Sequence, residues 1–210
     1  MNELEGSGEP GTGAPENLEA RLAGFDPPVL PPVLPDSDVS YVVTDTPVGR
    51  LVLAATEAAL VACSYDAEDQ VTERLARLVS PRVLRSARRL DPIRRELDGY
   101  FAGRVRRFGV PVDLALAGPF ARRVLRRLER VPYGATTTYG EVAGAVGSPG
   151  AARAVGLALR ANPVCIVVPC HRVVAADGRL TGYAGGLDAK RLLLDLERGP
   201  AAPDRPPSPS

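Results

Sequence analysis

The chain has 210 residues and a mass of 22.1 kDa, enough for one or two small domains with a hydrophobic core. No apolar run approaches the roughly 18 residues that a membrane-spanning helix needs, and the N-terminus lacks the basic and apolar segments of a secretory signal. Three cysteines, an odd number, argue against a disulfide framework and for a reducing cytoplasm. Two of them, Cys63 and Cys165, lie in apolar stretches and are expected to be small core residues.

The net charge of +1 hides an uneven distribution along the chain. Residues 1–38 carry 8 acidic residues and one arginine, a net charge of −7, whereas residues 119–199 carry 12 basic and 6 acidic residues, a net charge of +6. A basic domain is the electrostatic footprint of a protein that binds a phosphate backbone. Because Arg greatly outnumbers Lys and Ala and Pro are abundant, a coding bias explains the same excess, so both interpretations stay open.

The first 38 residues of the chain are acidic and rich in Pro and Gly. They contain seven Pro and five Gly and have almost no apolar periodicity, which predicts a disordered acidic arm. The arm competes with DNA phosphates or is a solvated tail without function. Residues 200–210 are interpreted as a second disordered tail.

Short β-rich runs bounded by turn residues follow at 41–44, 50–55 and 60–65, and they predict a small antiparallel meander. Two segments with apolar residues at helical spacing come next, and they predict helices over 70–79 and 90–101. The sequence therefore predicts an N-terminal α/β domain over residues 39–115.

Residues 120–131 predict a strongly basic amphipathic helix. Five arginines project from its polar face, and they either contact phosphates or are simply solvated. The apolar face is formed by Phe120, Val124, Leu125 and Leu128.

Two short helices joined by a Gly-containing turn predict a helix-turn-helix. Thr138 and Glu141 form a capping-box pattern at the start of the first helix, which runs to about Val146. Gly147–Pro149 supplies a turn, an N-cap and a Pro at the first helical position of the second helix, Gly150–Arg160. This helix either approaches a groove wall or packs into the core. Its predicted exposed side is small: Gly150, Ala151, Ala152, Ala154, Gly156 and Ala158.

The chain's only histidine, His171, follows Cys170. An apolar run, Val164–Val168, leads into the pair, and Pro169 biases the residue before it to an extended conformation. Cys170 is therefore expected on a turn after a buried strand, where a neighbouring histidine can take the proton of a nucleophilic thiol. A buried structural cysteine beside a surface histidine is the alternative.

The sequence PCHRV at 169–173, preceded by ARAVGLALRANP and followed by GYAGGLDAKRLLLDLE, resembles the O6-alkylguanine-DNA alkyltransferases, or methylated-DNA–protein-cysteine methyltransferases. The similarity is close from about 120 to 197, weaker over 41–118 and absent from about the first 38 residues. It implies an α+β fold. A ribonuclease-H-like N-terminal domain with a small antiparallel sheet precedes a mainly helical, winged-helix-like domain at 116–199, whose helix-turn-helix docks in the minor groove.

The resemblance also implies a function. A methyl or other alkyl group is transferred from O6 of guanine, and from O4 of thymine, irreversibly to the protein's own cysteine, once per molecule and after base flipping. The partner is double-stranded DNA with alkylated guanine. A bacterial cytoplasmic monomer without cofactor or obligate protein partner is expected. Some relatives carry a structural zinc, but with His171 committed and only Cys63 and Cys165 left, no four-ligand site is available, so no metal is expected.

Three residues form the catalytic relay that the resemblance implies. Cys170 is the nucleophile, His171 draws its proton through a water, and Glu197 orients His171 and stabilises its cation. An ordinary charge near a helix end is the alternative for Glu197. An apolar ridge is expected to hold this helix, which starts near Asp188, against the core: Leu192, Leu193 and Leu196.

The resemblance assigns further residues to DNA. Arg153 matches the arginine that fills the vacated base stack, and Tyr139 matches a tyrosine near the phosphate and N3 of the flipped guanine. Asn162 is expected to bridge the helix-turn-helix to the active-site turn. Arg160, at the end of the second helix, completes the DNA-contacting residues.

The segment 181–186 is expected to form the wall of the base pocket. Tyr183 can pack on the flipped purine because an aromatic face suits any base. Ala184 replaces the more usual Ser, so any hydrogen bond at this position must come from the backbone.

Three other functions fit parts of the pattern. A damage sensor of the same family binds the lesion without repair, but such relatives replace the motif cysteine, which is present here as Cys170. A Cys-His hydrolase needs an oxyanion hole and an orienting Asn or Asp, a geometry that adjacent Cys and His on one turn fit poorly. A transcription regulator needs base-reading side chains on the second helix, which is rich in Gly and Ala instead.

Overall fold

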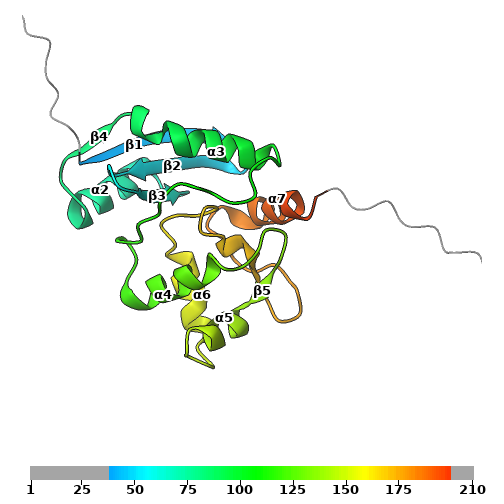
Figure 1. The fold of residues 1–210 in the computed structure, drawn as a ribbon. Helices are drawn as coiled ribbons and strands as arrows, with labels where there is room; N and C mark the ends of the chain where they lie inside the picture. Colours follow the sequence, from blue (N-terminus) through cyan, green and yellow to red (C-terminus); the bar gives the residue numbers. More distant parts are fainter. Residues whose placement is uncertain (1–37, 200–210) are drawn as a thin grey trace, which may run out of the picture. The chain divides into compact units, whose positions relative to one another are not determined.

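The computed structural model describes residues 38–199, all within the compact unit Ser37–Ser210 (Figure 1). Apart from Asp38, the predicted arm and the predicted C-terminal tail lie outside the described residues. None of the helices within 38–199 has the length and apolar character needed to span a membrane.

The N-terminal half is built on a four-stranded sheet. Strands β1 (Val39–Thr46), β2 (Gly49–Ala55) and β3 (Leu60–Ser64) form the predicted antiparallel meander. A fourth strand, β4 (Val83–Arg85), pairs parallel to β1, so the sheet is mixed rather than purely antiparallel. The prediction missed β4 because three residues are too few for a periodic signal.

One helix packs against each face of the sheet, and strands β2 and β3 are the most deeply buried (Figure 1). Alternate β2 side chains divide between two clusters: Leu51 and Leu53 pack with α3 (Asp91–Phe101), whereas Val52 packs with α2 (Glu68–Leu78). This explains why β2 reads as a continuous apolar run. Both helices agree with their predicted positions to within two residues. A 3₁₀ turn, η1 (Arg88–Leu90), precedes α3.

The C-terminal half is mainly helical, which confirms the α+β class. The helices α4 (Pro119–Leu128), α5 (Tyr139–Ala145) and α6 (Ala152–Arg160) pack on one another. A two-stranded parallel sheet of β5 (Thr137–Thr138) and β6 (Val173–Val174) joins the start of α5 to the segment after Cys170. A 3₁₀ turn, η2 (Cys170–Arg172), and the final helix, α7 (Gly186–Arg198), complete it.

The helix-turn-helix forms with one correction to its second helix. The capping box of Thr138 and Glu141 is present. However, α6 begins at Ala152 with Ala151 at its N-cap, so Ser148 is not the N-cap and Pro149 is not the first helical residue. The reason is Gly150, which adopts φ +84° and extends the turn.

Two predicted helix faces are also corrected. Ala158 is buried rather than exposed, because α6 packs on both α4 and α5, while Leu157 is 70% exposed. On α7, Leu192 is 40% exposed and does not belong to the ridge. Of the predicted ridge, Leu193 is buried and Leu196 is half-buried against the core, and Leu194 rather than Leu192 is the further leucine that faces inward, one helical turn from Lys190 and Glu197.

Candidate active site

The segment before Cys170 is held by the edge of the N-terminal sheet. The Cys63 N–H donates to the Pro163 carbonyl, and the Cys165 N–H donates to the Cys63 carbonyl, each at 2.8 Å. Between Cys165 and Cys170 the chain turns back at Ile166, which has φ +71°. A β-branched residue rarely adopts this left-handed conformation. The turn is therefore strained, and the surrounding contacts hold it in place.

Asn162 lies just after α6 and ties this helix to the cysteine turn. Its Nδ2 donates to the Val168 carbonyl at 3.0 Å and to Sγ of Cys170 at 3.2 Å. Its Oδ1 accepts from the Val164 N–H at 3.0 Å. The side chain is buried, so every polar atom it carries is committed to the turn.

Cys170 is the acidic member of the three cysteines. Hydrogen bonds from Cys165 and Asn162 and the charge of Lys190 lower its pKa against the opposing effect of burial. Burial raises the pKa of Cys63, and a hydrogen bond to Cys170 together with burial raises that of Cys165. Cys170 therefore holds the largest thiolate fraction at neutral pH, and thiolate is the nucleophilic form.

His171 is fully buried, and its Nε2 lies 2.9 Å from Oε1 of Glu197. Burial lowers the pKa of His171 despite the carboxylate, so the ring is neutral at pH 7. Because the ionised carboxylate can only accept, Nε2 carries the hydrogen and Nδ1 carries a lone pair. Nδ1 is buried without a hydrogen-bond partner among the described residues, so it is available to accept a proton.

Glu197 accepts hydrogen bonds from four further groups. Arg172 donates through Nε and Nη2, each at 2.8 Å, Tyr100 through its hydroxyl at 2.8 Å, and Gly134 through its N–H at 3.1 Å. Burial raises the pKa of Glu197, but hydrogen bonds from His171 and Arg172 and their charges outweigh it and lower the pKa to about 2. The Glu197 carboxylate is thus ionised at neutral pH.

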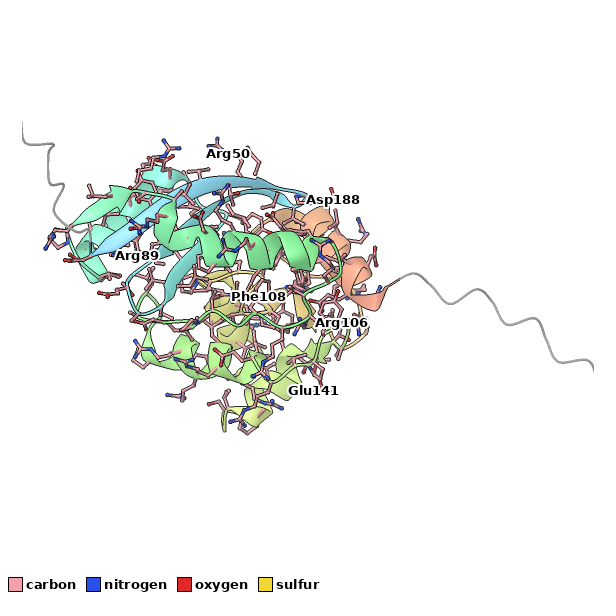
Figure 2. All side chains as sticks on the ribbon, turned by 45° about the horizontal axis from the view of Figure 1, so that its top comes forward. Arg50, Arg89, Arg106, Phe108, Glu141 and Asp188 are labelled. Carbon is pink, nitrogen blue, oxygen red and sulfur yellow. The ribbon has the colours of Figure 1, made fainter. Side chains whose placement is uncertain are left out.

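A covering layer of aromatic and arginine side chains lies over this carboxylate. Tyr133 donates to the Leu196 carbonyl at 3.3 Å and packs edge-on against Tyr100, with ring centroids 6.1 Å apart. Figure 2 shows Phe108 and Arg106 on the segment after α3; Phe108 packs on Tyr100 at 5.3 Å, and Arg106 lies over the Tyr133 ring at 5.7 Å. The segment that connects the two halves therefore closes the Glu197 site from outside.

We expect Gly134→Ala to destabilise the protein by about 3 kcal/mol. Gly134 has φ +77°, and a Cβ there would lie 2.9 Å from the carbonyl oxygen of Glu197. The matched control is Gly103→Ala, which has φ +71° but no atom within 4 Å of its Cβ, so only the backbone cost of about 1 kcal/mol is expected. Urea denaturation measures both, and equal losses would contradict the steric argument.

Lys190 is a component that the sequence reasoning missed. Its Nζ is buried and donates to the carbonyls of Val173 at 2.7 Å and Thr181 at 3.2 Å. Burial lowers its pKa, and the electrostatic interaction with Cys170 opposes that shift. A signal existed in the sequence, because this is the only lysine in a chain with 25 arginines.

Tyr183 lies between the catalytic turn and the N-terminal sheet. Its ring packs edge-on against His171, with centroids 6.4 Å apart, and against Tyr65, at 5.6 Å. A Cβ on Gly185 would lie 2.6 Å from the Tyr65 ring, so this position requires glycine. Tyr65, which follows β3, is a second residue of the site that its sequence surroundings do not indicate.

The remaining predicted residues lie around this centre. Tyr139, at the start of α5, shares a 2.6 Å hydrogen bond with Oγ1 of Thr181, so the helix-turn-helix is joined to the 181–186 segment. Arg153 and Arg160 are exposed on α6, and Ala184 is exposed after Tyr183. Within residues 38–199, no group of three or more His, Cys, Asp or Glu is arranged to hold a metal ion.

Two family models together cover most of the described chain. Residues 39–114 match the ribonuclease-like domain of 6-O-methylguanine DNA methyltransferase, and residues 119–199 match its DNA-binding domain. A methylated-DNA–protein-cysteine methyltransferase of Mycolicibacterium paratuberculosis is 44% identical over 160 residues, which cover 76% of this chain and 93% of the relative. The chain belongs to the O6-alkylguanine-DNA alkyltransferase family.

Other members of this family agree in sequence and structure. A methylated-DNA–protein-cysteine methyltransferase of Methanosarcina acetivorans is 41% identical over 158 residues, covering 75% of this chain and 97% of the relative. The crystal structure of Mycobacterium tuberculosis O6-methylguanine methyltransferase superimposes with a TM-score of 0.66 at 40% identity, covering 78% and 96% of the two chains. That of M. tuberculosis OGT in complex with DNA gives 0.65 at 38% identity, covering 76% and 92%. The predicted family is confirmed.

Proposed function

We propose that this alkyltransferase repairs DNA by moving an alkyl group from O6 of guanine to Sγ of Cys170, once per molecule. The observation that carries the proposal is the setting of Cys170, whose Sγ accepts a 3.2 Å hydrogen bond from Nδ2 of Asn162 inside the part of the chain that matches the family's DNA-binding domain. Hydrogen bonds from Cys165 and Asn162 also lower the pKa of the Cys170 thiol. A buried structural cysteine would have a raised pKa, as Cys63 has.

The proposed reaction begins with loss of the thiol proton from Cys170. The lone pair on Nδ1 of His171 takes this proton through one water, and the Glu197 carboxylate stabilises the imidazolium that results. Sγ then forms a bond to the alkyl carbon while the bond from that carbon to guanine O6 breaks, and the electron pair stays on the guanine. Because the thioether product is a poor leaving group, the protein turns over once.

The guanine that leaves needs a proton or a hydrogen bond. Tyr139 is the proposed donor, with Thr181 holding its hydroxyl at 2.6 Å. Tyr183 is proposed to pack on the flipped base, and the backbone near Ala184 is proposed to approach O6. Any hydrogen bond to the O6 edge of the guanine must come from these backbone groups, because the side chain of Ala184 has no donor.

DNA binding is proposed to run through α6 in the minor groove. Arg153 and Arg160 are exposed at its two ends, and Ala154 is exposed next to Arg153, so little side-chain bulk separates that part of the helix from a groove wall. Arg153 is proposed to enter the stack when the base leaves. Extrusion costs a few kcal/mol of pairing and stacking, which the guanidinium plane partly offsets.

Intact mass after incubation with a duplex that carries one O6-methylguanine tests the function. A gain of one methyl group, mapped to Cys170 and stopping at one equivalent, is expected for the native protein, and none for Cys170→Ala. Tight lesion binding without transfer would instead indicate a damage sensor. If the protein neither accepts the methyl group nor binds the lesion, the proposal is contradicted altogether.

Arg153→Ala is expected to weaken transfer to the flipped base more than binding to undamaged duplex. We expect about a tenfold lower transfer rate at subsaturating DNA, because the vacated stack is no longer filled. Arg160→Ala, at the other end of the same exposed helix, serves as the charge-matched control. If both variants lose only affinity, by equal factors, Arg153 is an ordinary phosphate contact.

Several expectations stay proposals beside this function. The two-domain division at 39–115 and 116–199 is supported by the family-model ranges of 39–114 and 119–199. A bacterial cytoplasmic monomer that needs no protein partner, and activity on O4 of thymine, rest on the family resemblance. Size-exclusion chromatography and a duplex with O4-methylthymine address the oligomeric state and the second substrate.

A further inference from the structure

Tyr100 is a buried residue of the active site to which the proposed mechanism gives no role. It lies on α3, in the N-terminal half of the chain, and its side chain is fully buried. Its hydroxyl donates to Oε1 of Glu197 at 2.8 Å, and this is the oxygen that lies 2.9 Å from Nε2 of His171. Arg172 donates to the same atom at 2.8 Å. One carboxylate oxygen therefore accepts from three donors, and one of them is the imidazole of the relay.

The packing around Tyr100 fixes the direction of its hydroxyl. Phe101 and Tyr133 pack edge-on against the ring, with centroids 5.5 Å and 6.1 Å away, and Phe108 lies at 5.3 Å with the ring planes tilted by 35°. Burial and the charge of Glu197 raise the pKa of Tyr100, so the hydroxyl keeps its proton at neutral pH. The phenol is therefore a fixed hydrogen-bond donor, and its one hydrogen is given to the carboxylate.

A donor on Oε1 of Glu197 weakens the interaction of this oxygen with His171. Hydrogen bonds to an ionised group are strong, and they lower the affinity of the carboxylate for any further proton. A more basic carboxylate would favour the ion pair, in which the imidazole carries a hydrogen on both nitrogens and Nδ1 has no lone pair. Only the neutral imidazole can take the Cys170 proton through a water.

Other charged and titratable groups face the His171–Glu197 pair, and they remain when the Tyr100 hydroxyl is removed. Burial lowers the pKa of His171 most, and two neighbouring positive charges act in the same direction. Two neighbouring phenols keep their protons at neutral pH, because burial above all raises their pKa. These groups are Arg172, Lys190, Tyr133 and Tyr183. A change in the imidazole of a Tyr100 variant can therefore be assigned to one hydrogen bond.

We propose that Tyr100 is a positioning residue of the relay, whose hydroxyl shares Oε1 of Glu197 with His171 and thereby keeps the imidazole neutral and able to accept the Cys170 proton. This inference rests on the proposed function for its role in repair. The protonation of the imidazole is a property of the protein alone and can be measured without DNA.

The test compares the native protein with Tyr100→Phe, which removes the hydroxyl and keeps the ring. The first measurement is a pH titration of the imidazole nitrogens by NMR on the untagged full-length protein, in which His171 is the only histidine. The second is the rate of methyl transfer from an O6-methylguanine duplex as a function of pH. Tyr41→Phe is the matched control, because the Tyr41 hydroxyl donates to Oε1 of Glu68 at 3.0 Å, a bond of the same type in the other core cluster.

For Tyr100→Phe we expect the midpoint of the His171 titration to rise by about one unit, because the carboxylate no longer shares its charge with the hydroxyl. The acid limb of the transfer profile should move by the same amount. Below the new midpoint the transfer rate should fall by up to about tenfold, and above it the rate should approach that of the native protein. Tyr41→Phe should move neither midpoint.

A second variant reverses the sign of the expected shift. Replacement of Tyr100 by a ring-fluorinated tyrosine keeps the hydroxyl and makes it a stronger donor, so the midpoint of the His171 titration should fall. This variant tests the inference independently of whether Tyr100→Phe folds, and circular dichroism checks the fold of both.

Two outcomes would overturn the inference. If the His171 titration is the same in the native protein and in a folded variant of Tyr100, the hydroxyl does not control the imidazole. If Tyr100→Phe loses the same fraction of the transfer rate at every pH, the hydroxyl only supports the structure. Failure of the native protein to accept methyl from DNA would contradict the proposed function, while the NMR titration would still decide the role of Tyr100.

Discussion

Glu197→Gln is expected to slow alkyl transfer by at least about 100-fold and to destabilise the fold by about 3–5 kcal/mol. The carboxylate accepts from His171, Arg172 and Tyr100, and Arg172 is itself buried. Glutamine keeps the shape, but it leaves the guanidinium without a counter-charge and no longer dictates which nitrogen of His171 carries the proton. Single-turnover transfer and urea denaturation measure the two losses.

The pH dependence of stability gives a second measurement on the same variant. The pKa of Glu197 is lowered from 4.5 to about 2 in the folded protein, so its contribution is complete above about pH 4.5 and is lost as the pH falls toward 2. The variant should lack this part of the acid-induced loss. Asp195→Asn, which removes an exposed carboxylate paired with Arg198 on the same helix, should change neither stability nor transfer appreciably. Equal effects from both variants would contradict a special role for Glu197.

Asn162→Asp is expected to slow transfer at pH 7 by about 100-fold. The substitution removes the amide donor that lies 3.2 Å from Sγ of Cys170 and places a carboxyl group at the same distance. Two negative charges this close cannot both form in a buried site, so either the thiol or the carboxyl keeps its proton, and the thiolate fraction falls.

Asn162→Ala separates the lost donor from the added charge. It is expected to slow transfer by about tenfold, because the amide bond to sulfur is lost without a new repulsion. When transfer rates are measured from pH 6 to pH 10, the rate of the alanine variant should recover at a lower pH than the rate of the aspartate variant. If the two variants behave alike, the carboxyl group is not close to the thiolate, and the role of Asn162 is confined to holding the turn through Val168 and Val164.

Local sequence signals predicted the parts of this molecule that depend on local structure. The capping box at Thr138 and the two N-terminal helices follow from side-chain chemistry and periodicity within a single element. Cys170, His171 and Glu197 came from a motif, and the structure brings His171 and Glu197 into contact. The predicted start of α6 was wrong. A Ser-Pro pair signals an N-cap only when the backbone that follows is helical, and Gly150, with its positive φ, leaves the helical conformation.

Contacts between residues that are far apart in the sequence could not be predicted from such local signals. Tyr100 reaches Glu197 across 97 positions of sequence, and no local pattern indicates that its hydroxyl is required there. Ile166 adopts a conformation that its side chain disfavours, which only the surrounding packing can impose. Leu192 was assigned to the wrong face of α7 because neighbouring leucines at 192–194 and 196 give an ambiguous apolar stripe.

The pairing of Cys63 with the segment 163–165 has a consequence for how reactivity arises during folding. The segment before Cys170 makes two backbone hydrogen bonds with β3, one accepted from the Cys63 N–H and one donated to the Cys63 carbonyl, and the Glu197 carboxylate accepts one from Tyr100 on α3. A fragment that contains only residues 119–199 could keep the family's DNA-binding helices but would lack all three. The geometry around Cys170 is therefore expected to form fully only when both halves have folded together, so a chain that is still incomplete or partly unfolded is expected to hold this cysteine on a less firmly fixed turn.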